Sequence, residues 1–378
     1  MWLAAAIGGL LVLITGMLPT TDAGNVLREV APVLIFLVGV TVIAELADTA
    51  GVFDAAAHRA AVFGRGRTFR LWLCVVALGT ITTIALSLDT TAVLLTPVVL
   101  TLASRVGLPA IPFAMTTVWL ANTASLLLPI SNLTNLLAQN KIGVSPAGFA
   151  TRMWLPALVA IIVTILVLGL RYRRSLRGSY DIPERPTVSD RPLFWTAVGV
   201  CVAIGPLAVA GVPIAWISSA GAVILAALVL ARRREALRFS LVPWRLVVLV
   251  VGLFFVIGAW QLHGLNELLS HVAGTGGSFL NLLQFTGVSA AGANIGNNLP
   301  AYAALQPLAG NADRLYALLL GVNLGPLVLL WGSLATLLWR ERCIARGVQI
   351  SWREFATVGI IGVPILLVTT TAALLVTS

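Results

Sequence analysis

The sequence predicts an all-α polytopic membrane protein that consists of two inverted repeats. Of its 378 residues, 59% are hydrophobic and only 10% are charged, whereas a soluble domain usually carries about 25% charged residues. A chain of this composition can bury its apolar surface only in a lipid bilayer. Matched residues in the two halves indicate the repeats, and two interrupted apolar segments indicate re-entrant helical hairpins. We therefore expect about nine spanning helices and two hairpins.

Nine apolar runs are each long enough to cross the hydrocarbon core of a bilayer, which is about 30 Å thick. They lie at 2–19, 30–47, 110–138, 150–170, 192–210, 213–231, 246–262, 315–339 and 355–376. The first run lacks both a basic start and a small-residue cleavage site. It is therefore expected to be a spanning helix rather than a signal peptide.

Two further apolar segments, 69–104 and 277–310, are interrupted by the strings SLDTT (87–91) and GNNLP (296–300). The arms that flank each interruption are short or end in polar residues, which favours a re-entrant hairpin over two full crossings. Backbone at such a tip is tolerated only inside protein or beside water. Each tip is therefore expected to lie at a protein-lined or water-filled site.

The basic residues define an expected topology. If the 48–70 loop faces the cytoplasm and each hairpin returns to the side it entered from, 20 of the 24 basic residues are cytoplasmic. This bias is the positive-inside rule, and it places the N-terminus in the cytoplasm and the C-terminus outside. The net charge of +10 thus indicates topology, and no nucleic-acid partner is expected.

Residues of the first half recur in the second half at a constant spacing, which indicates an internal repeat. At an offset of 213, Gly39, Gly51, Asp54, His58 and Gly64 match Gly252, Gly264, Glu267, His271 and Gly277. After the hairpins the offset is 201, where Asn122 matches Asn323 and SNLTNLL (131–137) aligns with GSLATLL (332–338). An odd number of crossings separates equivalent elements, so the second copy is inverted, as in many secondary transporters.

The predicted organisation is a first transport repeat at 1–170, a basic cytoplasmic linker at 171–191 and a second repeat at 192–378. The run at 192–210 has no counterpart before residue 2. Either the natural chain begins earlier with a further helix, or the first repeat lacks this helix.

Polar residues concentrate at the two hairpin tips and in the middles of 110–138 and 315–339, which are expected to be broken helices. Freed carbonyls, amides and exposed helix starts bind ions and small solutes at the midplane of secondary transporters. The expected substrate- and ion-binding residues are Asp89, Thr90, Thr91, Asn122, Thr123, Ser125, Ser131, Asn132, Asn135, Asn297, Asn298, Asn323, Ser333 and Thr336.

Asp89 is a carboxylic acid near the centre of an apolar stretch, where ionisable residues are costly and usually functional. Its alternative role is to cap the helix that starts near Thr91, and the two roles are compatible. The amides of 121–135 are alternatively hydrogen-bonding groups between helices. Glu45 and Asp48 are either a solvated pair or members of a proton relay together with Asp89.

The three cysteines, Cys74, Cys201 and Cys343, are far apart and have no CxxC spacing. Neither a disulfide framework nor a thiolate metal site is therefore predicted. No HExxH or GxSxG motif lies in a suitable span. The sequence predicts a carrier without a cofactor or metal rather than an enzyme.

Four strings carry a family resemblance: DTTAVLLTPVVL (89–100), NTASLLLPISNLTNLL (122–137), NNLPA (297–301) and GSLATLLW (332–339). Through them, and over residues 2–376, the chain resembles the arsenite/antimonite permeases of the ion-transporter superfamily, which also contains the sodium–dicarboxylate symporters. The family commonly has Asn-Asp at the first tip and Asp-Thr-Ala-Ser in the broken span. This chain has Leu88-Asp89 and Asn122-Thr123-Ala124-Ser125 instead.

The resemblance implies a carrier of the bacterial inner membrane that exports trivalent arsenic or antimony as a neutral hydroxide, in exchange for protons or together with a soluble ATPase. The implied inward-facing half-site contains Asp89, Thr90, Asn122, Thr123, Ser131, Asn132 and Asn135. The implied outward-facing half-site contains Asn297, Asn298, Asn323, Ser333 and Thr336.

Hydroxyls and amides without basic side chains suit a neutral solute that needs only donors and acceptors. Sodium-coupled uptake of a small dicarboxylate is an alternative, because helix N-termini also bind anions. A second alternative is cation/proton antiport with Asp89 as the exchanging acid. The expected partners are a small inorganic or organic solute, a coupling proton or sodium ion, and the lipid bilayer. A homodimer and a soluble ATPase partner are compatible with the sequence.

Overall fold

The computed structural model describes residues 2–184, 187–232, 235, 238 and 241–377. Regular secondary structure in these residues is helical apart from one isolated antiparallel bridge between Arg67 and Ser179. Eight of the described helices are long and apolar enough to cross a membrane. The predicted all-α polytopic fold is thereby confirmed.

The first half of the chain forms nine α-helices. They are α1 (Trp2–Ile14), α2 (Thr20–Thr49), α3 (Val52–Gly64), α4 (Thr68–Ala85), α5 (Leu88–Thr90), α6 (Thr96–Arg105), α7 (Ala110–Thr123), α8 (Leu133–Ile142) and α9 (Pro146–Arg171). A π-helical stretch, Thr91–Leu95, joins α5 to α6. Pro97 lies two residues after this stretch. Because it has no N–H, it cannot complete the regular helical ladder there.

The described residues of the second half form nine further α-helices. They are α10 (Arg191–Val209), α11 (Ile214–Arg232), α12 (Trp244–Leu262), α13 (Leu265–Ala273), α14 (Phe279–Gly296), α15 (Asn298–Leu305), α16 (Ala312–Leu324), α17 (Leu334–Ala345) and α18 (Trp352–Val376).

Two segments are built differently from their expectations. The run expected to span at 2–19 forms only the 13 residues of α1, because Gly16 adopts a left-handed conformation and Pro19 precedes α2. A crossing needs about 20 residues. The arms of the first hairpin were expected to be short or to end in polar residues; Thr68–Ala85 and Leu88–Arg105 each have 18 residues and enough apolar character to span. Re-entrance of this hairpin therefore stays a prediction.

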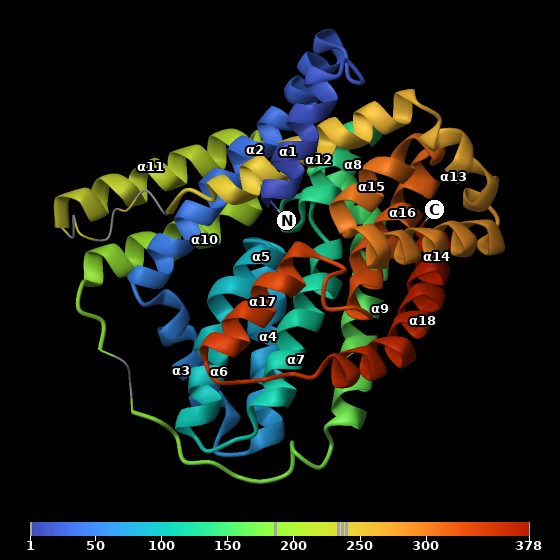
Figure 1. Cartoon of the computed structure of the whole chain (residues 1–378). Coiled ribbons are helices and arrows are strands. Elements are labelled where there is room, and N and C mark those ends of the chain that lie inside the picture. Colours follow the sequence, from blue (N-terminus) through green and yellow to red (C-terminus); the bar gives the residue numbers. More distant parts are fainter. Residues whose placement is uncertain (1, 185–186, 233–234, 236–237, 239–240, 378) are drawn as a thin grey trace.

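Helices of the first half pack against helices of the second half. The first helix α1 packs on α12, and α11 packs on α2 (Figure 1). A Cβ on Gly252 would lie 2.2 Å from the carbonyl oxygen of Ala5, and a Cβ on Gly39 would lie 2.7 Å from the Cβ of Ser218. Only glycine allows helices to approach this closely. The residues of the two contacts are 213 positions apart, which is the offset of the predicted repeats.

The helices form two groups. Helices α1, α2, α10, α11 and α12 form a tilted layer, and α4–α9 together with α14–α18 form a bundle beside it (Figure 1). Two contacts join α9 to neighbouring parts of the bundle. Arg152 pairs with Asp313 at one end, and Arg171 pairs with Glu354 at the other. The bundle is therefore fastened at both ends of α9.

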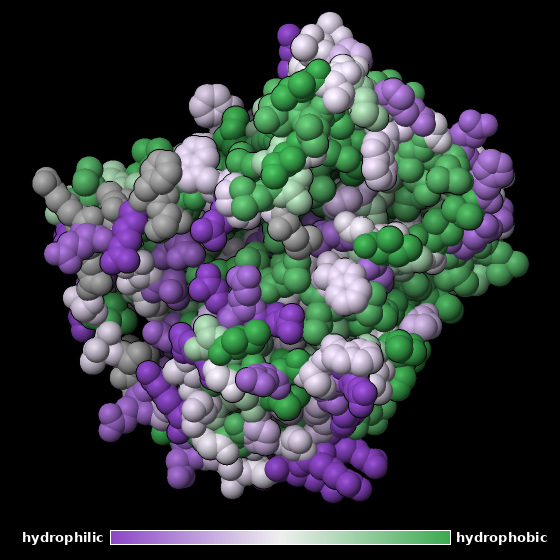
Figure 2. Space-filling view, in the orientation of Figure 1, coloured by the Kyte–Doolittle hydropathy of each residue, from purple (hydrophilic) through white to green (hydrophobic). Residues whose placement is uncertain are grey.

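Apolar side chains cover much of the surface. Figure 2 shows them gathered over α1 and α12 in the upper part of the view, while hydrophilic side chains gather along the lower edge. Large apolar residues of several helices lie on the surface of the molecule. Among them, Ile14, Trp216 and Ile361 are more than half exposed. A soluble monomer rarely exposes such continuous apolar surface, so this surface is suited to contact lipid.

Both predicted broken spans are interrupted. Helix α7 ends at Thr123, and α8 begins at Leu133 after two short 3-10 turns. Helix α16 ends at Leu324, and α17 begins at Leu334. Each second half starts from a side-chain cap: Asn132 accepts from the Thr134 N–H, and Ser333 accepts from the Thr336 N–H. Such caps are what a buried helix start requires.

Candidate substrate-binding site between the hairpin tips

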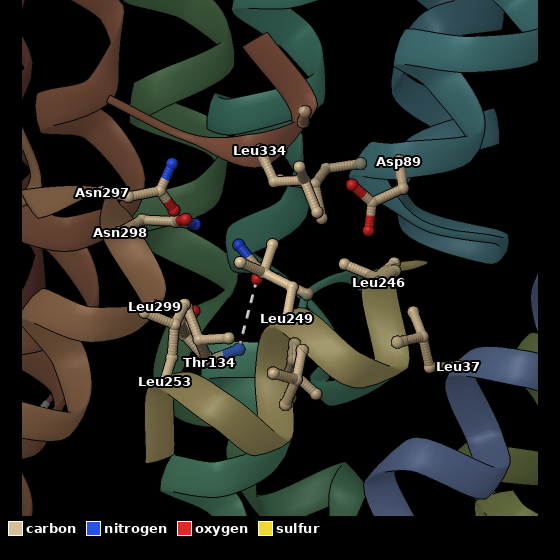
Figure 3. Close-up of a pocket in the computed structure, with 15 residues that line it drawn as sticks. Leu37, Asp89, Thr134, Leu246, Leu249, Leu253, Asn297, Asn298, Leu299 and Leu334 are labelled. Atoms are coloured by element: carbon tan, nitrogen blue, oxygen red, sulfur yellow. Dashed lines mark hydrogen bonds between the residues drawn. The ribbon is translucent and has the colours of Figure 1, made fainter. Parts of the chain in front are cut away.

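A small pocket of about 40 Å³ lies between the two interrupted segments and the tilted layer (Figure 3). Its polar lining comes from the first tip, the start of α8 and the second tip. Its apolar lining comes mainly from α12, with single residues from α2 and other helices. The lining residues are Leu37, Leu88, Asp89, Asn132, Leu133, Thr134, Leu246, Leu249, Val250, Leu253, Asn297, Asn298, Leu299, Leu334 and Ala335.

The first tip presents a carboxyl group. The Ser87 hydroxyl accepts a hydrogen bond from the Thr90 N–H at 3.1 Å and lies 3.0 Å from the Thr90 hydroxyl, which closes the turn. Asp89 is half-buried, and Figure 3 shows its carboxyl group turned toward the pocket. Ser87, not Asp89, therefore caps the helix that starts at Leu88. The Asp89 carboxyl is left available to the pocket.

The second tip presents two buried amides, Asn297 and Asn298. Figure 3 shows them on the side of the pocket opposite Asp89. The Asn297 Nδ2 donates to the carbonyl oxygen of Trp331 at 3.0 Å. Asn297 has φ 82° and ψ 153°, a combination that residues other than glycine rarely adopt. The tip is therefore held in a strained conformation by its surroundings.

A buried amide cluster joins the two broken helices beside the pocket. The Oδ1 of Asn323 accepts from Asn132 Nδ2 at 2.8 Å and from the Thr134 hydroxyl at 3.0 Å. The Nδ2 of Asn323 donates to Asn135 Oδ1 at 2.9 Å. Asn135 in turn donates to the carbonyl oxygen of Ser125. These bonds connect the α16 end to the α8 start, so they fix the position of Asn132 and Thr134 in the pocket wall.

Several expected site residues lie outside the pocket lining. Asn122, Thr123 and Ser125 are buried, and their side chains donate to carbonyl oxygens of Val118, Trp119 and Asn122 respectively. The Oδ1 of Asn122 has no hydrogen-bond partner among the described residues. These side chains shape the break of the first broken helix rather than the pocket surface.

The remaining hydroxyls support the tips and breaks. The hydroxyls of Thr91 and Thr83 lie 2.8 Å apart inside the first hairpin. The Ser131 hydroxyl donates to the carbonyl oxygen of Ile84 at 2.9 Å. The hydroxyls of Ser333 and Thr336 lie 2.8 Å apart at the start of α17. Because each bonds within the protein, their role in this structure is to hold the helix ends.

A larger cavity of about 850 Å³ lies next to the pocket and shares Asp89 with it. We call this cavity the vestibule. The rest of its lining is apolar and mostly leucine, and its polar lining residues are Thr41, Glu45, Asp89, Thr90, Arg245, Glu341 and Arg342. Asp89 therefore faces both spaces.

The two expected relay acids lie in different surroundings. Glu45 is half-buried and lines the vestibule, whereas Asp48 is exposed near the end of α2 and does not line it. Of the two, Glu45 is the acid that shares a cavity with Asp89.

Three parts of the site were missed by sequence reasoning. Thr134 lines the pocket and bonds to Asn323, although its place in the SNLTN string could have indicated it. Asn294, one turn before the second tip, bonds to the break between α16 and α17. The leucines of α12 gave no signal, because an apolar pocket wall looks like an ordinary lipid-facing helix face in sequence.

The site contains oxygen and amide ligands rather than thiols. Cys74, Cys201 and Cys343 lie in α4, α10 and α17 and do not line the pocket. Among the residues that the structure describes, no three histidine, cysteine, aspartate or glutamate side chains gather as a metal site. A solute in this pocket would therefore be bound through carboxyl, hydroxyl and amide groups.

Comparisons with known proteins place the chain among membrane transporters. A family model described as "Citrate transporter" matches residues 1–336. The "Arsenical pump membrane protein" of Escherichia coli (strain K12) is 30% identical over 407 residues, which cover 98% of this chain and 92% of that protein. The protein with the same description from Yersinia enterocolitica is 30% identical over 403 residues, with the same coverage.

A solved structure has the same kind of fold. The Alcanivorax borkumensis YdaH transporter, whose crystal structure is described as having an unusual topology, has a TM-score of 0.59 with this chain. Its sequence is 15% identical, and the match covers 94% of this chain and 87% of that chain. At this identity the likeness concerns the fold.

The spanning helices, the match to a transporter family model and the similarity to membrane transporters over nearly the whole chain define a polytopic membrane transporter. The chain belongs to the citrate transporter family. The predicted resemblance to arsenite permeases is confirmed by its similarity to arsenical pump membrane proteins over nearly its whole length.

Proposed function

We propose that this chain is a secondary active transporter of the bacterial inner membrane that exports arsenite or antimonite as a neutral hydroxide, in exchange for protons, by alternating access. The observation that carries the proposal is the small pocket at the two tips, whose lining combines one carboxyl with amides and a hydroxyl and contains no basic residue. The similarity to arsenical pump membrane proteins supports the choice of solute.

The size of the pocket favours a small solute. A buried water needs about 10–15 Å³ on the same volume scale, so about 40 Å³ accommodates a few hydroxyl-sized groups. A metalloid with three hydroxyls is of this size. Citrate, the solute in the family's description, has three carboxylates and needs a larger space.

The chemistry of the pocket favours a neutral solute. An amide side chain both donates and accepts hydrogen bonds, as a metalloid hydroxyl does. Asn298 and Asp89 face the space between the tips (Figure 3). Together they offer an amide donor, an amide acceptor and a carboxyl group. No positively charged side chain is present to balance an anionic solute. Leu37 of α2 and the leucines of α12 line the remaining side with apolar surface.

Asp89 is the proposed coupling residue because it faces both the pocket and the vestibule. A proton released from Asp89 can leave through the vestibule without crossing the pocket. Protonation removes the charge that faces the solute, so solute and proton compete for the same side chain. Glu45, in the vestibule wall, is proposed to pass the proton, and Asp48 is a more exposed candidate for the same role.

The proposed orientation places the vestibule toward the cytoplasm. Glu341 and Arg342 in its wall belong to a segment that the positive-inside rule assigns to the cytoplasmic side. The N-terminus would then be cytoplasmic and the C-terminus outside. The homodimer and the soluble ATPase partner stay predictions.

A sodium-coupled symporter of a small dicarboxylate is the second candidate. The starts of α8 and α15 both lie at the pocket, and unpaired N–H groups at helix starts attract carboxylates. Cation/proton antiport through Asp89 is the third candidate, and it requires no organic solute.

Transport into everted membrane vesicles separates these candidates. Arsenite, succinate and sodium would each be supplied under an imposed proton or sodium gradient. The proposal predicts arsenite uptake that depends on the proton gradient, with no uptake of succinate. Succinate uptake driven by sodium would contradict the proposal and support the second candidate. Proton-linked sodium movement without arsenite movement would support the third.

A further inference from the structure

Asn294 lies in α14, one turn before the second tip, and its side chain bonds in two directions. Its Nδ2 donates to the carbonyl oxygen of Ala290 at 2.9 Å in the same helix and to that of Gly325 at 2.7 Å. Its Oδ1 accepts from the N–H of Leu329 at 3.1 Å. Gly325 and Leu329 belong to the break between α16 and α17, so one side chain connects the hairpin to the break.

Trp331 adds two further bonds between the same parts. Its indole Nε1 donates to the carbonyl oxygen of Asn294 at 2.8 Å, and its own carbonyl oxygen accepts from Asn297 Nδ2 at 3.0 Å. The break segment thus holds both the last turn of α14 and the tip itself. The positive φ of Asn297 is a strained conformation that persists only where the surroundings impose it.

The close packing of this region agrees with a fixed connection. A Cβ on Gly325 would lie 2.6 Å from the Cα of Ala290, so the break and α14 are in backbone contact. At the first hairpin, the corresponding links are the bond from the Ser131 hydroxyl to the carbonyl oxygen of Ile84 and the bond from the Thr96 hydroxyl to the Thr117 hydroxyl. The second tip therefore has more side-chain bonds to its own broken helix than the first tip has.

We infer that Asn294 is a positioning residue for the solute site. It holds the second tip against the α16–α17 break, so that Asn297 and Asn298 form a preorganised wall opposite Asp89. Asn294 does not line the pocket, and its effect on the solute passes through the tip. The part of this inference that concerns solute binding rests on the proposed function; the part that concerns the tip does not.

Two variants remove the connection in different degrees. Asn294→Leu has a similar volume and loses all three side-chain bonds. Asn294→Asp keeps the acceptor for the Leu329 N–H but loses the donor to Gly325, and it remains informative if the leucine variant is not inserted into the membrane. Asn281→Leu and Asn281→Asp, at the other end of α14, are the matched controls.

Hydrogen exchange of the purified full-length protein, read by mass spectrometry, tests the connection without any solute. The Leu329 amide should exchange about tenfold faster or more in Asn294→Leu, because its acceptor is gone, and the tip amides should also exchange faster. Asn294→Asp should loosen the tip while protecting Leu329 better than the leucine variant does. Wild-type exchange of Leu329 and the tip in Asn294→Leu would overturn the inference.

Transport by the same variants tests the positioning role, with whichever solute the wild type carries in the vesicle assay. The half-saturating concentration should rise about tenfold in Asn294→Leu, because preorganisation contributes to affinity, while the maximal rate per inserted protein changes much less. A lower maximal rate at an unchanged half-saturating concentration would overturn the positioning role. Absence of transport by the wild type itself would refute the proposed function, and hydrogen exchange would still decide the inference about the tip.

Discussion

The two predicted repeats place different chemistry at their tips. The first tip carries the Asp89 carboxyl on a turn that is closed by its own hydroxyls, Ser87 and Thr90. The second tip carries the amides of Asn297 and Asn298, and Asn297 is bonded to the break of its broken helix. One wall of the pocket can gain or lose a proton, and the opposite wall offers only neutral donors and acceptors. The two predicted repeats thus contribute different chemistry to the candidate site.

Replacing the acid of the first tip should produce the largest effect. Asp89→Asn keeps the shape of the tip but cannot exchange a proton, so proton-driven transport should fall by about two orders of magnitude or more. The rate of solute uptake in vesicles, normalised to inserted protein, measures this. Asp54→Asn, which changes an exposed acid on α3, should transport normally. Undiminished proton-driven uptake by Asp89→Asn would remove the coupling role.

Equivalent asparagines of the two broken helices should differ in their contribution to stability. Asn323→Leu breaks three bonds of the buried amide cluster and leaves Asn132 and Asn135 without this partner. The free energy of unfolding should fall by about 2–3 kcal/mol. Asn122→Leu loses one bond, to the Val118 carbonyl oxygen, and removes an unpaired oxygen. It should cost less than about 1 kcal/mol.

Thermal unfolding in detergent, followed by size-exclusion chromatography of the remaining soluble fraction, compares these two variants. Equal destabilisation would contradict the difference between the repeats. A larger loss in Asn122→Leu than in Asn323→Leu would show that the cluster is not the main connection between the broken helices.

A third comparison concerns the connections between α3 and the first hairpin and between α13 and the second hairpin. We call these connections the first joint and the second joint. Tyr180 donates to the Ala61 carbonyl oxygen at 2.6 Å, and Arg314 donates to that of Gly274 at 2.9 Å and to those of Ala273 and Gly276. Ala61 and Gly274 are 213 positions apart, so they are equivalent in the predicted repeats.

Arg314→Gln should destabilise the protein by about 2 kcal/mol, since several bonds from a buried cation are lost. Tyr180→Phe should cost about 1 kcal/mol, because it removes a single hydroxyl. The same thermal assay measures both. The comparison fails if the tyrosine variant is the less stable of the two.

The smallest expected effect is a pH dependence of the first joint. Burial raises the pKa of the Tyr180 hydroxyl, so the native state favours the protonated form. The resulting stabilisation is present below the usual tyrosine pKa of about 10 and is lost as the pH rises above it. Tyr180→Phe should show a smaller loss of stability between pH 9 and pH 11. An identical pH dependence in both proteins would exclude this role of Tyr180.

The sequence predicts local features better than long-range ones. The interruptions at SLDTT and GNNLP and the breaks after Thr123 and Leu324 follow from local chemistry. Serine, aspartate, threonine and asparagine side chains compete for backbone hydrogen bonds and favour caps and turns, and proline and glycine weaken a helix interior. Asn132 was expected in the site for the same reason. Its bond to Asn323, 191 positions away, depends on how the repeats pack and could only be anticipated through the repeat itself.

Other contacts carry no local signal. The apolar wall of α12 has the same residue types as a lipid-facing helix, so its leucines could not be assigned to the pocket. Asn294 is one asparagine among several in its segment, and its role depends on the Leu329 N–H of a distant break. The length of α1 was overestimated because hydropathy continues through Gly16, where the backbone reverses.

The most direct test is whether the two tips face one another in the membrane. Cysteines at positions 89 and 298 would be introduced after Cys74, Cys201 and Cys343 are replaced, with a protease site inserted in the linker that follows residue 180. A short bifunctional thiol reagent should join the halves, so that they stay together on a gel after cleavage, and the pair at positions 54 and 298 should not be joined. If positions 89 and 298 each react singly but never become linked, the pocket between the tips does not exist.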